Sequence, residues 1–450
     1  AALNALERQL VGFRLAASER ALQLQLQLAE LRGECPTRIL AGQARLDDAL
    51  AAARRCDTHE EVVRLLALSG KYGEAEHELA PTDTSETATA VHIATGNWAA
   101  AAAGADARAD ELAREEPMQY RTQRYIANAA AGQHCLAALF RTYAGATNAF
   151  AAITDRDTGS ACAIYEIASL PVAEQAAAFA RRPRSASDSE SGAGAGLELL
   201  AQELAYAAGE PLGEFDRTEA VSALMFLFDR TRIWLAPFQL EAHPTATGAL
   251  AAMTTYELLR GDLAAARGYL AKVPPSYTHD ELAIGLALRD GSPIHDDGHH
   301  PHAGHDEAIS LRDGVVDERT QMYLGDEDAA PFRALLSHAV DGDGSALVEV
   351  LELDRVQWQA FAIPLLGVLP RITRHRDAVS AALRMFRNDL TSYARVHLPF
   401  NALSDMIAYR DIARLAGDTA DASQWQAIID RHVEVLRDRH KATALLLWDE

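Results

Sequence analysis

The ten residues LALSGKYGEA at positions 66–75 read as the end of one helix, a tight turn and the start of a second helix. Gly70 has no Cβ, so it can take the left-handed conformation that commonly ends a helix. The large apolar Tyr72 follows, and the small Ala75 lies three residues further on, on the same helix face. This layout is typical of antiparallel helices that pack at short distance.

The same layout recurs in IATGNWAAA at positions 93–101 and in LLRGDLAAARGYL at positions 258–270. The turns at Gly70 and Gly261 resemble those of tetratricopeptide repeats, which implies a stacked helical protein that binds other molecules. The interval from Gly70 to Gly96 is 26 residues, so the regular 34-residue period is not kept. We therefore predict an all-α fold in two lobes, either an irregular helical bundle or a TPR-like α-solenoid.

The length of 450 residues exceeds what one hydrophobic core normally serves. Residues 181–196 are small, polar and glycine-rich, which is typical of a flexible linker. They divide the chain into a predicted N-terminal helical lobe, 1–180, and a C-terminal lobe, 197–450. A second break, at 291–306, is rich in histidine and aspartate. The stretch AVSALMFLF at 220–228 is apolar on nearly every side and indicates a central helix.

The formal net charge of −22 excludes strong phosphate binding unless a local arginine patch overrides it, so we expect no nucleic-acid partner. A basic protein partner suits this charge. The near-complete use of arginine over lysine, together with the acidic excess, also gives a halophile-like composition. These two interpretations of the charge are not separated by composition alone.

The four cysteines, Cys35, Cys56, Cys135 and Cys162, have no CxxC spacing. Because a chain of this length does not need disulfides for stability, we predict buried free thiols in a reducing compartment. No apolar run approaches the roughly 18 residues that span a bilayer, and no secretory signal is visible. The sequence therefore predicts a cytoplasmic protein that does not contact the membrane.

The densest group of metal-binding side chains lies in the second break. Imidazoles and carboxylates at this density can bind zinc, nickel or copper. The candidate ligands are His295, His299, His300, His302 and His305. Because Gly298, Pro301 and Gly304 interrupt them, we favour a flexible loop with adventitious metal affinity over a catalytic metal centre. We predict no catalytic residue and no cofactor.

The stretch NDLTSYARV at positions 388–396 resembles the magnesium-binding motif of class I bacterial terpene synthases. That resemblance implies a metal-bound diphosphate held by Asn388 and Asp389. The chain departs from the motif because Val396 stands where the last glutamate ligand belongs. An α-helical, metal-dependent enzyme that uses Mg or Zn is therefore the alternative to a binding protein.

The helical layout and stretches such as 256–274 resemble the immunity protein 49 family. This resemblance implies a cytoplasmic protein that neutralises a toxin by binding it. We accordingly predict a non-enzymatic protein that binds a protein partner, as an immunity or regulatory protein. Tyr72 and Trp98 are the candidate anchors for the partner, although packing between neighbouring helices is the favoured interpretation of both rings.

Overall fold

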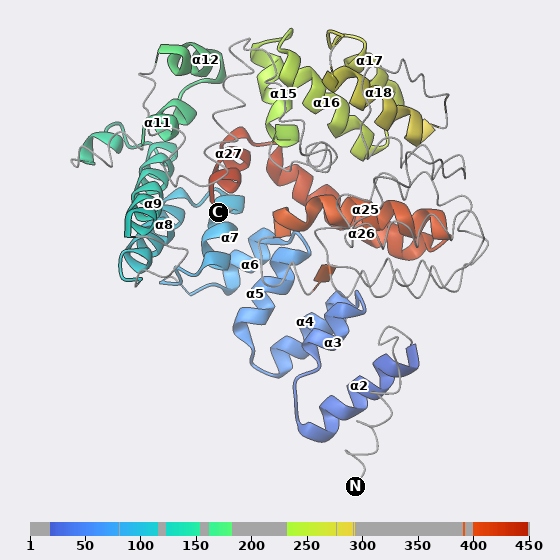
Figure 1. Cartoon of the computed structure of the whole chain (residues 1–450). Helices are drawn as coiled ribbons and strands as arrows, with labels where there is room; N and C mark the ends of the chain where they lie inside the picture. The colour runs from blue at the N-terminus through green and yellow to red at the C-terminus, as the bar shows by residue number, and fades with distance from the viewer. Residues whose placement is uncertain are drawn as a thin grey trace. The chain divides into compact units, whose positions relative to one another are not determined.

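The computed structural model describes residues 19–80, 82–115, 123–153, 162–181, 232–275, 277–290, 292, 390–391 and 399–448 (Figure 1). Every element in these ranges is an α-helix or a short 3-10 helix, and they contain no strand. The prediction of an all-α fold is confirmed for this part of the chain. The solenoid and the two-lobe arrangement remain predictions, because the linker at 182–196 and most of 291–306 lie outside the described residues.

The described helices belong to two compact units, and each unit combines segments from both sides of the predicted linker. The first unit contains α2 (Glu19–Arg32), α3 (Thr37–Gly42), α4 (Leu46–Arg55), α5 (His59–Leu68), the second half of α16 (Thr247–Arg260), α17 (Leu263–Leu270), α18 (Tyr277–Asp290), η4 (Pro399–Ala402), α25 (Leu403–Ala416) and most of α26 (Thr419–Leu436).

The second unit contains α6 (Tyr72–Glu78), α7 (Glu86–Thr95), α8 (Trp98–Leu112), α9 (Gln123–Tyr143), η1 (Phe150–Ala152), α11 (Ala163–Ser169), α12 (Val172–Arg181), α15 (Arg232–Ala242), the first half of α16, the end of α26 and α27 (Arg439–Trp448).

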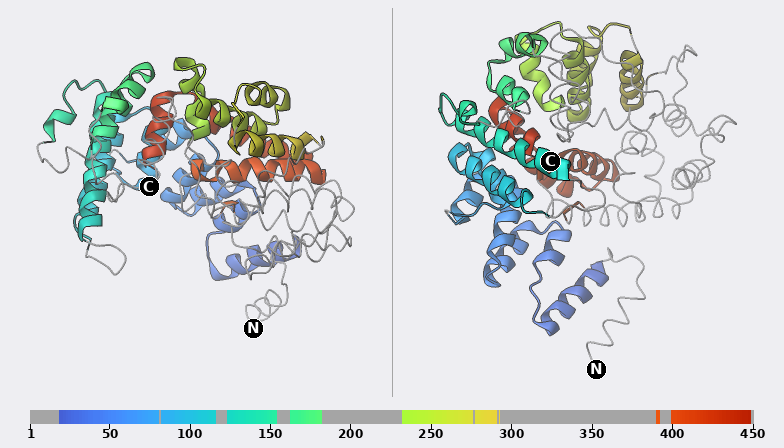
Figure 2. Two further views of the ribbon diagram at one scale, coloured as in Figure 1. Left: turned by 45° about the horizontal axis from the view of Figure 1, so that its top comes forward. Right: turned by 60° about the vertical axis from the view of Figure 1, so that its left-hand side comes forward.

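Helices that are consecutive in the chain pack against each other in both units. In the first unit α3 contacts α4, and α4 contacts α5. In the second unit α6, α7, α8 and α9 contact one another in sequence, and the pair α8 and α9 lies side by side (Figure 2). The approach of α7 to α8 is so close that a Cβ on Gly104 would lie 2.9 Å from Thr89 Cβ. Only glycine fits there without a shift.

Two of the predicted glycine turns share one geometry with a third that was not predicted. Gly96 and Gly261, which were predicted, and Gly417, which was not, follow α7, α16 and α25 with φ of 83°, 83° and 86°. The N–H of the next residue donates to the carbonyl five residues back, at 2.8, 2.9 and 2.9 Å. This is the Schellman arrangement, in which a left-handed residue satisfies the last carbonyls of a helix. The glycine signal in the sequence therefore located the ends of α7 and α16 correctly.

The turns from α3 to α8 also recur at multiples of thirteen residues. Left-handed residues stand at Ala44, Asp57, Gly70 and Gly96, which are 13, 13 and 26 residues apart. A helix begins two residues after each, and the residue five positions after each is a buried apolar one: Ala49, Val62, Ala75 and Ala101. In α4 and α5 a ten-residue helix with a three-residue turn accounts for the spacing of thirteen, which differs from the 34-residue period of tetratricopeptide repeats.

The core of the second unit is built around α27. Every residue from Ala442 to Trp448 is buried, and α27 contacts α7, α9 and α15. Because residues 442–448 are buried whichever way their side chains point, α27 is a central helix of this unit. The helix for which the sequence predicted a central position, 220–228, lies outside the described residues.

All four cysteines form disulfides, so the prediction of free thiols is wrong. Cys35 pairs with Cys56, and Cys135 pairs with Cys162. The packing of successive helices brings each pair together, with Cα–Cα distances of 6.1 and 5.1 Å. Chain length was the wrong criterion, because each bridge is local in sequence. The cytoplasmic location, which rested partly on free thiols, remains a prediction without that support.

Candidate functional site

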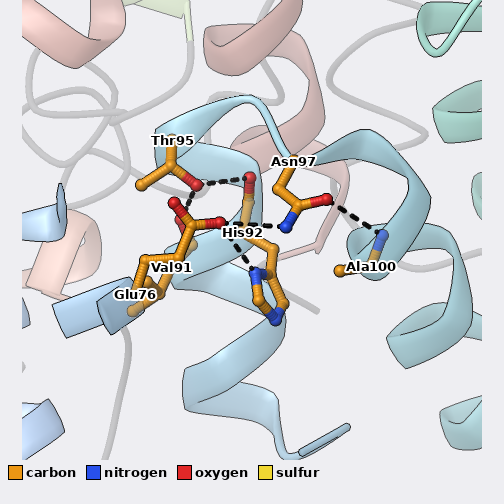
Figure 3. A network of polar contacts seen from close by, with 6 residues as sticks. All are labelled: Glu76, Val91, His92, Thr95, Asn97 and Ala100. Carbon is orange, nitrogen blue, oxygen red and sulfur yellow. Dashed lines mark hydrogen bonds and ion pairs between the residues drawn. The ribbon is translucent and has the colours of Figure 1, made fainter. Parts of the chain in front are cut away.

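A polar cluster joins α6, α7 and α8 in the second unit (Figure 3). The carboxylate of Glu76 accepts a hydrogen bond from Asn97 Nδ2 at 3.0 Å and lies 3.3 Å from His92 Nδ1 (Figure 3). Thr95, one turn from His92, donates its hydroxyl to the carbonyls of Val91 and His92. The carboxylate on α6 thus holds one side chain from α7 and one from the residue that caps α8.

The left-handed turn at Gly96 places these groups. It follows the last turn of α7, which carries His92, and it turns the chain so that Asn97 precedes α8. The Asn97 side chain forms two hydrogen bonds. Its Nδ2 donates to Glu76, and its Oδ1 accepts from the Ala100 N–H at 3.4 Å. The residue that caps α8 therefore also ties the helix to α6.

Electrostatically, the cluster favours the charged form of Glu76. Partial burial raises the pKa of its carboxyl group, but the hydrogen bonds from Asn97 and His92 outweigh burial and leave the pKa lowered. A carboxylate beside Nδ1 also favours the tautomer that carries its proton there. Such a pair can orient a histidine base, but among the described residues the His92 ring has no bond to a hydroxyl or thiol nucleophile.

A shallow groove of ≈ 300 Å³ runs along α8 and the end of α9. Alanines form most of it, with a charged pair at one side. The lining residues are Ala99, Ala102, Ala103, Asp106, Arg141, Ala144 and Ala146. Arg141 donates to Asp106, which also lies 3.3 Å from His134 Nδ1. The groove is therefore lined by small apolar side chains and by one pair of opposite charges.

Aromatic rings lie beside the groove, where Trp98 begins α8. Its ring centroid is 5.1 Å from that of Tyr143 and 6.1 Å from that of Phe140. Tyr143 also stacks on His440, with centroids 4.2 Å apart. Burial raises the pKa of the Tyr143 hydroxyl. Burial and the positive charge of Arg439 both lower the pKa of His440. His440 is therefore neutral at pH 7, which suits a stacked ring.

The two predicted anchors differ in accessibility. Trp98 is half-buried and packs on Phe140 and Tyr143 of α9. Tyr72 is only 4% exposed, and its hydroxyl lies 2.9 Å from Nδ1 of the fully buried His432. The Tyr72 ring therefore packs inside the unit, which agrees with the prediction that it lies between neighbouring helices.

The predicted metal ligands lie outside the described residues. These are His295, His299, His300, His302 and His305, together with Asn388 and Asp389 of the terpene-synthase-like stretch. The next two residues of that stretch, Leu390 and Thr391, are described and buried. Within the described ranges no group of three or more His, Cys, Asp or Glu side chains is arranged to hold a metal ion.

Sequence reasoning identified the turn at Gly96 but missed the cluster and the groove. The Gly96-Asn97 pair was a usable signal, since asparagine directly before a helix predicts a cap. No local pattern links Asp106 to Arg141, which are 35 residues apart. Their proximity depends on the register between α8 and α9.

The described residues include no helix that is both long enough and apolar enough to cross a bilayer. No protein-family model, no curated protein and no solved structure matches this chain.

Proposed function

We propose that this chain is a non-enzymatic binding protein that holds a protein partner on the groove of α8 and α9. The observation that carries the proposal is the groove itself, which is lined by alanines and the Asp106–Arg141 pair and which begins next to the half-buried Trp98 in the sequence of α8. Small side chains allow a partner helix to approach closely, and a tryptophan is a frequent anchor in protein interfaces.

The acidic excess of the chain supports a basic partner, because complementary charge speeds association and disfavours wrong partners. The consecutive packing of α6 to α9 adds support, since stacked helices commonly serve as binding scaffolds. An immunity or regulatory protein that neutralises its partner by binding it is the class we propose, in keeping with the resemblances to tetratricopeptide repeats and to immunity protein 49.

An affinity pull-down from the native host at its working salt tests this function. We expect one stoichiometric protein partner with the unaltered chain. Ala103→Glu, which places a charge on an exposed alanine that lines the groove, should abolish capture. The matched control is Ala177→Glu, on an exposed alanine of α12 in the same unit. Equal capture of the partner by both variants would show that the groove of α8 and α9 does not bind it.

The same purified protein should be analysed for metal. A stoichiometric metal that is lost in Asp389→Asn, with no protein partner captured, would favour the enzyme alternative. Metal that is lost only when residues 295–305 are deleted would indicate a loop that scavenges ions.

A further inference from the structure

The two disulfides differ in their access to solvent. Cys135 is 0% exposed and Cys162 is 4% exposed, so the bridge between α9 and α11 lies in the core of the second unit. In the first unit Cys56 is exposed and Cys35 is half-buried. In the folded chain, a thiol in solution can therefore approach one sulfur of the Cys35–Cys56 bridge. It can approach the sulfurs of the Cys135–Cys162 bridge only after local unfolding.

The surroundings of Cys35 suit a sulfur that leaves as a thiolate. Its Sγ lies 2.9 Å from Thr37 Oγ1, and Thr37 is itself buried. A hydroxyl at this distance can donate to a sulfur anion, which lowers the energy of the charged form. The same Sγ lies 3.7 Å from the Ala52 carbonyl oxygen, which can accept from the thiol after protonation. Polar partners for the reduced form are thus already in place.

The helices that the bridge joins are also held together by packing. Cys35 precedes α3, and Cys56 directly follows α4. The buried residues Leu40, Leu46 and Ala49 belong to these two helices, which contact each other directly. Opening the bridge therefore leaves the pair of helices in apolar contact, so exchange does not require unfolding of the unit.

We infer that Cys35–Cys56 is a thiol–disulfide exchange site that takes up a small thiol at Cys56. A thiolate attacks Cys56 Sγ and forms a mixed disulfide there. The bond to Cys35 breaks, and Cys35 leaves with the electron pair and takes a proton from water. A second thiolate then attacks the mixed disulfide and releases Cys56 with the oxidised dimer of the small thiol. Two thiols are oxidised while one protein disulfide is reduced.

Peptide mass spectrometry on the folded chain tests the access to the two bridges. The protein is incubated with reduced glutathione, and free thiols are trapped by alkylation, with and without denaturant. Without denaturant, we expect Cys35 and Cys56 to be labelled at least about tenfold faster than Cys135 and Cys162. In denaturant, the labelling rates of all four cysteines should become similar. Equal labelling without denaturant, faster labelling of the buried pair, or labelling of Cys35 and Cys56 before glutathione is added would overturn the inference.

Two variants test which sulfur is attacked. In Cys35→Ser, Cys56 is left as a thiol, and oxidised glutathione should add one glutathione to it. In Cys56→Ser, the half-buried Cys35 should react more slowly. Far-ultraviolet circular dichroism of both variants checks that the helices remain. A faster adduct on Cys35 than on Cys56 in folded variants would show that the assignment of the attacked and leaving sulfurs is wrong.

Discussion

Glu76 is the residue on which the polar contacts of α6, α7 and α8 converge. Its carboxylate accepts from Asn97 and lies beside His92, in a position between the ends of short helices. Hydrogen bonds to a charged carboxylate are stronger than those between neutral groups. The protonation state of this single side chain therefore affects how firmly three helices are joined.

Substituting Glu76→Gln should reduce the dependence of stability on acidic pH. In the folded chain the pKa of Glu76 lies below its ordinary value of 4.5, so the charged carboxylate stabilises the fold above that pH. This stabilisation is lost as the pH falls through the folded pKa. We expect the urea midpoint of the unaltered chain to fall more between pH 7 and about pH 3.5 than that of Glu76→Gln.

Circular dichroism at a series of pH values gives these midpoints. The matched control is Glu74→Gln, on the same helix but exposed, which should keep the pH dependence of the unaltered chain. An unchanged pH dependence in Glu76→Gln would show that the cluster does not couple protonation to folding.

At the scale of the helix, the residues that follow the left-handed glycines determine how the next helix begins. Asn97 and Asp262 occupy equivalent positions, and each accepts from the N–H three residues on, at 3.4 and 3.0 Å. Among the described residues Asn97 has a second side-chain bond, to Glu76, whereas Asp262 has none. The two caps are therefore chemically similar but differ in what else they hold.

Replacing each cap with alanine should show this difference. Asp262→Ala is expected to cost about 1 kcal/mol, the usual value of a cap. Asn97→Ala should cost roughly 1 kcal/mol more, because the hydrogen bond to Glu76 is also lost. Native-state hydrogen exchange of amides in the first turns of α17 and α8 measures both effects.

Asn97→Ser separates the two contributions, since serine can cap α8 but is too short to replace the amide that donates to Glu76. It should fall between the unaltered chain and Asn97→Ala. Equal costs for Asn97→Ala and Asp262→Ala would mean that the bond to Glu76 adds nothing.

The helices were predictable to the extent that their signals are local. Glycine at Gly70, Gly96 and Gly261 predicted three turns correctly, because a residue without Cβ favours the left-handed cap. The left-handed Ala44 and Asp57 gave no such signal, so the thirteen-residue recurrence was not evident from glycines alone.

The candidate site was less predictable because its contacts depend on how helices pack. The Asp106–Arg141 pair needs the register of α8 and α9, and the disulfides need the hairpins that bring the sulfurs together. For Trp98 the sequence predicted a large apolar residue at the start of a helix, but not the rings of α9 beneath it. Local patterns do not contain this information.

At the scale of the whole molecule, α27 completes the core of the second unit by contacting α7, α9 and α15. Leu445→Asp would place a charge at a position that is 3% exposed. We expect a loss of about 4 kcal/mol or more, because a buried charge without a partner is among the most destabilising changes.

Hydrogen exchange with mass spectrometry should then show α7, α9 and α15 losing protection together. The matched control is Leu31→Asp, on a leucine that is 53% exposed, which should leave the exchange of these helices unchanged. Loss of protection confined to α27 would show that the helix is not required by its neighbours.

The position of α27 also affects the order of events during synthesis. About 300 residues separate α9 from Trp448, and translation at roughly 5–20 residues per second leaves an interval of about 15–60 s between their emergence from the ribosome. Throughout that interval, the surfaces of α7 and α9 that α27 later covers have no native neighbour. A nascent chain of this protein therefore exposes these surfaces of α7 and α9 to solvent until α27 has been synthesised.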